Sequence, residues 1–77
     1  MKNLDKVKEI LVSVSGCDAD NITADTSLVK DMDMDSFAIM DAVTALERAF
    51  DISIPDRDLR KLSTVGDVTA YLESQGK

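Results

Sequence analysis

The sequence predicts an all-α protein, a four-helix bundle with a long loop after its first helix. Apolar residues recur at three- and four-residue intervals over several stretches, and no segment alternates polar and apolar residues. Glycine or proline punctuates the ends of these stretches. We therefore expect three longer helices and one short one. A chain of 77 residues suits one domain, which we take to span residues 1–77.

The first periodic stretch predicts an amphipathic helix from about residue 3 to residue 15. Asn3 stands where a capping residue is expected. Gly16 follows the last periodic position, and glycine commonly ends helices there. The apolar face is made of Leu4, Val7, Ile10, Leu11 and Val14.

A long loop is predicted for residues 17–34, which show no sustained period and are rich in Asp, Asn, Ser and Thr. Loops of this length are unusual in small domains and are often functional. We expect Ile22, Leu28 and Val29 to attach this loop to the core.

The second helix is expected from Ser36 to Phe50, with the carboxylate of Asp35 as its N-terminal cap. An i, i+3, i+4, i+7 pattern predicts which face is buried. The predicted core stripe consists of Ile39, Ala42, Val43, Leu46, Ala49 and Phe50.

Two shorter segments complete the bundle. Pro55 favours the start of a short helix over residues 56–62, which offers Leu59 and Leu62 to the core. Thr64 and Asp67 are three residues apart and fit a capping box. The capping box predicts a last helix that runs to about residue 74.

The composition limits both the chemistry and the partners of the chain. With 15 acidic and 9 basic residues the net charge is −6, so we expect neither nucleic acid nor an anionic membrane as a partner. No apolar run approaches the ~18 residues that a membrane span requires, and the N-terminus lacks a signal-peptide pattern, so we expect a cytoplasmic monomer without membrane insertion. The chain has no His and one Cys, which excludes His-based triads and argues against an enzyme.

Alternating aspartates before the second helix resemble the start of a calcium-binding EF-hand loop. That loop needs Gly at its sixth position and Glu at its twelfth, and these positions hold Ser36 and Ala42. We therefore expect no metal site, and we assign the aspartates to a solvated loop and a helix cap. They are Asp31, Asp33 and Asp35.

Ser36 is the candidate site residue. With Asp35 as the cap, its hydroxyl lies in the first helical turn, where backbone N–H groups have no intrahelical partner and the helix dipole is positive. A phosphate ester is well tolerated there. No base is available to activate the hydroxyl as a nucleophile, so Ser36 is expected to be modified by another enzyme.

A second line of residues on the same helix predicts a surface for partners. Phe37, Met40 and Thr44 follow one another at i, i+3 and i+7 beside the core stripe. Charged residues flank them, namely Asp41, Glu47 and Arg48. The alternative is that Phe37 and Met40 widen the core stripe, because small bundles need wide apolar faces.

Several short motifs resemble those of acyl carrier proteins. Asp35-Ser36-Phe37 is similar to the Asp-Ser-Leu motif of that family. Further elements stand in the expected order and spacing between Leu28 and Leu72: Ala45-Leu46-Glu47, Phe50, Ile54-Pro55-Asp56, Thr64-Val65-Gly66-Asp67 and Tyr71. Together at this spacing the motifs are specific, whereas a lone Asp-Ser would not be.

The resemblance implies a function and a site. It implies that a phosphopantetheinyl transferase attaches 4'-phosphopantetheine from coenzyme A to Ser36, and that the arm carries acyl groups as thioesters. It implies a four-helix bundle of acyl-carrier type that serves ligases, synthases or acyltransferases with basic docking patches. Partner contacts would fall on Asp35, Phe37, Met40, Asp41, Thr44, Glu47 and Arg48. The acyl chain would lie among Ile39, Val43, Leu46, Leu59 and Leu62.

Four positions depart from the family pattern. Asp33 stands where the family usually has Gly, and Phe37 stands where it usually has Leu. Ala38 and Arg48 occupy positions that are often acidic in the family. Because rim charges act on encounter rate and partner choice, these changes predict a specialised carrier rather than one for housekeeping fatty-acid enzymes. Asp-Ser-Phe also resembles aminoacyl carriers of D-alanyl type, so an aminoacyl or peptidyl carrier is an alternative. An unmodified helical adaptor is the alternative from another class.

Overall fold

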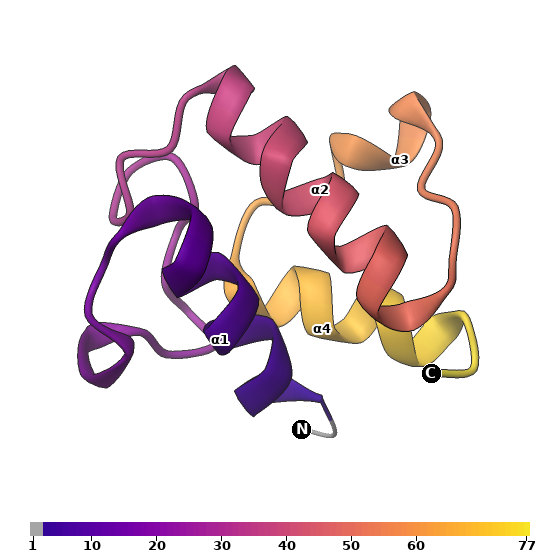
Figure 1. Ribbon diagram of the computed structural model, residues 1–77, viewed down its shortest axis with the longest axis horizontal. Coiled ribbons are helices and arrows are strands. Elements are labelled where there is room, and N and C mark those ends of the chain that lie inside the picture. Colours follow the sequence, from indigo (N-terminus) through magenta and orange to yellow (C-terminus); the bar gives the residue numbers. More distant parts are fainter. Residues whose placement is uncertain (1–2) are drawn as a thin grey trace.

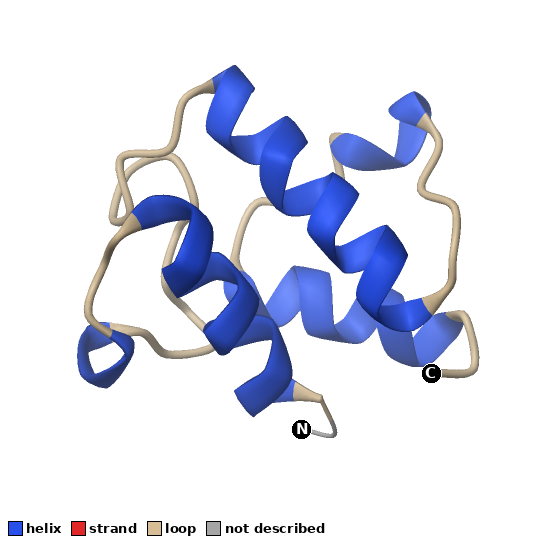
Figure 2. Ribbon diagram, viewed as in Figure 1, coloured by secondary structure: helices blue, strands red, loops and turns tan. Residues whose placement is uncertain are grey.

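The computed structural model describes residues 3–77, so residues 1 and 2 of the predicted domain lie outside the described part. The described chain forms four α-helices and one short 3-10 turn: α1 (Leu4–Ser15), η1 (Ala19–Asn21), α2 (Ser36–Phe50), α3 (Asp56–Leu59) and α4 (Val65–Ser74). α1 packs against both α2 and α4, and α3 lies in the connection between α2 and α4 (Figure 1). Within residues 3–77 no strand forms (Figure 2). The predicted all-α bundle is confirmed.

The ends of α1 follow the sequence only in part. Gly16 adopts a φ of 77°, which favours glycine, and its N–H bonds to the carbonyl of Val12. Asn3 occupies the N-cap position, but its φ is 72° and its side chain makes no capping hydrogen bond. The predicted side-chain cap at Asn3 is therefore wrong.

The core is a single cluster of side chains, most of which come from α1, α2, α4 and the long loop. Its members with at most 1% of their surface exposed are Val7, Leu11, Leu46, Val65 and Leu72. Two predicted core positions are wrong. Ala49 is exposed because it lies at the edge of the α2 stripe, close to the end of the helix. Val29 is 58% exposed, whereas its neighbour Leu28 is buried and anchors the loop as predicted.

The long loop is held to the segment that precedes α4 by backbone hydrogen bonds. The N–H of Leu28 donates to the carbonyl of Ser63 at 3.0 Å, and the N–H of Val65 donates to the carbonyl of Thr26 at 3.0 Å. The N–H of Gly66 reaches the carbonyl of Ala24 at 2.7 Å. These bonds fix residues 24–28 against the start of α4.

α3 is shorter than the sequence predicts. It ends at Leu59, and the predicted extension to residue 62 is wrong because Lys61 and Leu62 bond to carbonyls three residues back, which makes a tight turn. The capping box of α4 is confirmed: the Asp67 N–H donates to the Thr64 hydroxyl at 3.1 Å, and the Thr64 N–H donates to the Asp67 carboxylate at 3.2 Å.

A hydrogen bond joins α3 to α4. The hydroxyl of Tyr71 donates to Oδ2 of Asp58 at 2.8 Å, and Lys61 forms an ion pair with the same carboxylate at 3.4 Å. The tyrosine hydrogen bond is the main cause that lowers the pKa of Asp58, with Lys61 and Arg57 adding to it. The same bond raises the pKa of Tyr71.

We expect Gly66→Ala to destabilise the protein although alanine favours helices. A Cβ at this position would lie 2.9 Å from the backbone oxygen of Ala24, and a backbone oxygen cannot move aside cheaply. The helical preference for alanine is worth ~1 kcal/mol, whereas the strain of overpacking costs roughly 1–3 kcal/mol. Urea unfolding measures the net change. Ala70→Gly, at an exposed position of α4, is the control for propensity alone. A more stable Gly66→Ala variant would contradict the close approach.

Replacing Tyr71 by Phe should raise the pKa of Asp58 toward its ordinary value of 3.8. In the wild-type protein the bond stabilises the fold above that ordinary pKa, and the contribution is lost as the pH falls through the lowered pKa of the folded state. At alkaline pH the stabilisation by this bond is present below the ordinary tyrosine pKa of 10.0. It is lost as the pH rises through the raised pKa of Tyr71 in the folded state. NMR titration of the Asp58 carboxyl carbon measures the shift, and an unchanged titration in Tyr71→Phe would contradict it.

Candidate functional site

The start of α2 carries the predicted site residue in an accessible position. Asp35 is the N-cap, and its Oδ1 accepts a hydrogen bond from the N–H of Ala38 at 2.8 Å. Ser36 is the first residue of the helix, and its side chain is exposed. The predicted cap is confirmed, and it leaves the serine hydroxyl free at the helix end.

A phosphodiester fits this position. Within residues 3–77 nothing accepts a hydrogen bond from the N–H of Ser36 or of Phe37, since the first amides used are those of Ala38 and Ile39. Two free N–H donors and the positive end of the helix dipole stabilise an anion on the serine oxygen. Ser36 can therefore carry a phosphodiester on its hydroxyl.

The loop residues before Ser36 fix the entry into α2. Met32 and Met34 are buried, so the two methionines fill the core. Between them Asp33 adopts a φ of 53°, the left-handed region that glycine favours and that Asp tolerates better than most residues. This backbone conformation explains why the acyl-carrier pattern has glycine here. The N–H of Met34 also donates to the carbonyl of Leu28 at 3.0 Å.

One face of α2 is open to solvent, as the partner-surface interpretation requires. Phe37 is 77% exposed and Met40 is 46% exposed, so neither widens the core stripe. The other exposed members of this face are Asp41, Thr44 and Arg48. With ~100° of rotation per residue, Phe37, Met40, Asp41, Thr44 and Arg48 lie within roughly 100° of one another around the helix. We call these five residues the α2 outer face.

Glu47 has a different environment from the α2 outer face. It is half-buried, and its Oε2 accepts a hydrogen bond from the N–H of Ile54 at 2.7 Å. This bond ties the end of α2 to the chain that leads into α3. The carboxylate therefore serves the fold, a role that the helical spacing did not reveal because Ile54 lies outside the helix.

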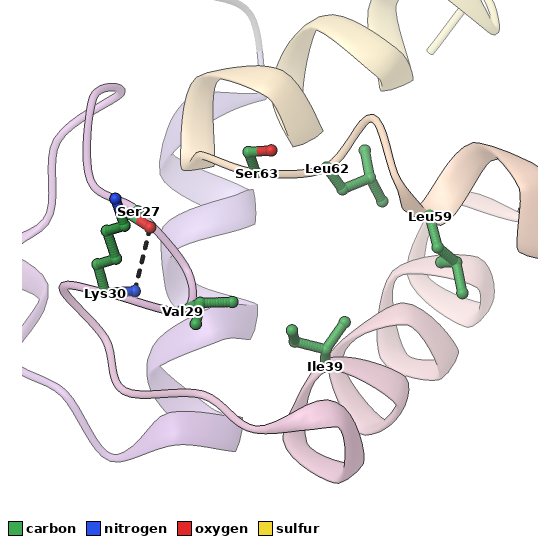
Figure 3. Close-up of a pocket in the computed structure, with 7 residues that line it drawn as sticks. All are labelled: Ser27, Val29, Lys30, Ile39, Leu59, Leu62 and Ser63. Atoms are coloured by element: carbon green, nitrogen blue, oxygen red, sulfur yellow. Dashed lines mark hydrogen bonds between the residues drawn. The ribbon is translucent and has the colours of Figure 1, made fainter.

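A surface pocket of about 530 Å³ opens between α2, α3 and the long loop (Figure 3). Ile39, Leu59 and Leu62, three of the five residues predicted for the acyl chain, line it. The other two, Val43 and Leu46, are buried in the core and do not line it. The structure therefore places the cavity at the N-terminal part of α2, one turn from Ser36.

Four lining residues were not predicted, namely Ser27, Val29, Lys30 and Ser63. They come from the loop and from the segment before α4, which the backbone hydrogen bonds bring together. Because this pairing joins residues far apart in sequence, no local pattern could have indicated it.

Neither a cluster of metal ligands nor a membrane-spanning helix occurs in the described part of the chain. Within residues 3–77 no group of three Cys, Asp or Glu side chains lies close enough to hold a metal ion. Across that same part of the chain no helix is both long and apolar enough to cross a membrane.

Comparison with known proteins agrees with the site. The chain matches the family model "Phosphopantetheine attachment site" over residues 5–72. A relative from Bdellovibrio bacteriovorus, named acyl carrier protein, is 47% identical over 72 residues, which cover 94% of this chain and 92% of the relative.

Solved structures with the same fold carry related names. A holo acyl carrier protein from Nitrosomonas europaea is 30% identical with a TM-score of 0.84, covering 97% of this chain and 96% of that one. A structure from Mycobacterium tuberculosis, also described as an acyl carrier protein, is 32% identical with a TM-score of 0.86, covering 94% of this chain and 96% of that one. The chain therefore belongs to the phosphopantetheine-binding acyl carrier proteins, which carry acyl groups on 4'-phosphopantetheine for acyl-handling enzymes and are not themselves enzymes.

Proposed function

We propose that Ser36 is the attachment residue for 4'-phosphopantetheine. The observation that supports this most directly is an exposed hydroxyl at the first position of α2, beside two backbone N–H groups that no other described residue uses. In the attachment step the serine oxygen bonds to phosphorus while the pyrophosphate bond of coenzyme A breaks, and the nucleotide half leaves. The chain has no His, so a phosphopantetheinyl transferase supplies the base.

The α2 outer face is the proposed docking surface for that transferase and for ligases, synthases or acyltransferases. Phe37 and Met40 offer apolar anchors next to the attachment site, and exposed Phe or Met at the centre of an interface contributes more than rim charges do. Asp35 and Asp41 would meet basic patches of these enzymes, and Arg48 favours partners that differ from those of a uniformly acidic helix. We predict the cytoplasm as the place where these partners meet the carrier.

The pocket of about 530 Å³ is the proposed shelter for the acyl chain. Its apolar wall contains Ile39, Leu59 and Leu62, and burial of a chain against them is favourable by ~0.8 kcal/mol per methylene. Val43 and Leu46, which the sequence also assigns to the acyl chain, are buried in the core and lie outside this lining. A chain that enters from Ser36 therefore lies across α2 near its start rather than along the helix.

We expect Ser36→Ala to abolish attachment of the arm. Incubation of the wild-type protein with coenzyme A and a phosphopantetheinyl transferase should add the mass of one phosphopantetheine group, measured by intact mass spectrometry. Ser53→Ala removes another exposed hydroxyl and should load normally. Loading of Ser36→Ala would overturn the assignment, and failure of the wild-type chain with transferases of several specificities would favour the unmodified adaptor.

Phe37→Ala should lower the kcat/KM of arm transfer by roughly tenfold, because truncation of an aromatic anchor at an interface costs ~1–2 kcal/mol. The melting temperature should stay the same, because the ring is 77% exposed and contributes little to the core. Phe37→Leu restores an apolar side chain and should recover most of the rate. Equal rates for Phe37→Ala and the wild-type protein would remove Phe37 from the docking surface.

A further inference from the structure

We propose that the pocket is adapted to acyl groups that end in a carboxylate, with the ammonium group of Lys30 and the hydroxyls of Ser27 and Ser63 receiving that end. This inference rests on the proposed attachment at Ser36. It concerns the chemistry of the cargo.

The walls of the pocket differ in polarity. Apolar side chains from α2 and from the segment 59–62 make one part of the lining: Ile39, Leu59 and Leu62. Ser27 and Lys30 lie on the loop across the pocket, together with the apolar Val29, and Ser63 lies next to Leu62 on the chain that enters α4 (Figure 3). We call Ser27, Lys30 and Ser63 the polar edge. Ser36 stands one turn before Ile39, a rise of about 4.5 Å along α2, so the attachment point lies on the side of the apolar wall. A cargo laid against that wall brings its far end to the polar edge.

The polar edge offers hydrogen-bond donors for a carboxylate. Ser27 Oγ accepts a hydrogen bond from the backbone N–H of Lys30 at 3.1 Å, which leaves the hydroxyl proton of Ser27 available. Within residues 3–77 no hydrogen bond occupies the hydroxyl of Ser63, and its backbone N–H bonds to Asp67. Two hydroxyl donors and one ammonium group match the acceptor oxygens of a carboxylate.

The one charged side chain in the pocket lining also favours an anion. The seven lining residues include one cation and no acidic side chain, in a chain with a net charge of −6. Lys30 forms no ion pair within residues 3–77. The nearby carboxylates of Asp31 and Asp67 already accept backbone N–H groups, from Ser27 at 2.8 Å and from Ser63 at 3.3 Å. Lys30 is therefore the one charged residue in the lining of this pocket, and it has no ion-pair partner within residues 3–77.

The size of the effect is limited by solvent. Lys30 is exposed, and exposed ion pairs give no more than about a fivefold preference. The polar edge therefore discriminates between cargo ends and does not determine whether a chain enters the pocket. The apolar wall provides that driving force for both kinds of chain.

The test compares two arms of equal length. A transferase loads the wild-type protein and Lys30→Gln with hexanoyl or adipoyl arms from the corresponding coenzyme A thioesters, which differ in a terminal carboxylate. The rate of thioester cleavage by hydroxylamine reports how well the pocket shelters each cargo. Lys6→Gln removes the same charge from the exposed face of α1 and serves as the matched control.

We expect Lys30→Gln to speed cleavage of the adipoyl thioester by about twofold to fivefold and to leave the hexanoyl thioester unchanged. High salt should act on the wild-type adipoyl form in the same direction, and Lys6→Gln should change neither. Equal effects of Lys30→Gln on both cargoes, or no effect on either, would overturn the carboxylate preference while loading itself succeeds. Failure to load any arm would instead refute the attachment at Ser36.

Discussion

The backbone hydrogen bonds between residues 24–28 and residues 63–66 determine the shape of the site. The loop before α2 is long, and ordering it costs conformational entropy that its polar sequence cannot recover alone. The bonds to Ser63, Val65 and Gly66, together with the buried Ile22 and Leu28, hold the loop in place. They set one wall of the pocket and the path on which Met32 and Met34 enter the core. The position of Ser36 follows from that path.

Three groups of residues with different roles point in different directions around the axis of α2. The buried stripe holds the bundle together, and the α2 outer face stays open to solvent. Ser36 lies between the two, roughly 60° from Ile39 and about as far from the direction of Phe37 and Met40. An arm attached there can turn toward the pocket or toward a docked enzyme without unfolding any turn of the helix. This arrangement suits a carrier whose cargo alternates between shelter and reaction.

Local patterns predicted most of the fold. Caps at Asp35 and Thr64 and the left-handed Gly16 fixed helix ends, because each acts within a few residues of the chain. Two errors occurred at helix ends. α3 stops at Leu59, where three-residue turns take over, and the periodicity of its apolar residues is the same for either structure. The capping failure at Asn3 depends on its backbone angle, which the residue type does not specify.

The candidate site was predictable to a similar degree. The places of Asp35 and Ser36 at the start of α2 follow from spacing and motif. Helical spacing left the exposure of Phe37 open, and the polar half of the pocket depends on the pairing of two distant segments. Helical periodicity also cannot separate Glu47 from the α2 outer face, because the partner of its carboxylate is a backbone N–H beyond the helix. Non-local backbone contacts account for both failures.

The tip of the loop at η1 differs from the rest of the loop. Residues 18–21 are all exposed, and the bonds that pin the loop begin only at Ala24. Extra residues at an exposed tip add little closure entropy, about 0.6 kcal/mol for each doubling of loop length. A reporter peptide inserted there would therefore leave the pairing of residues 24–28 with the start of α4 in place.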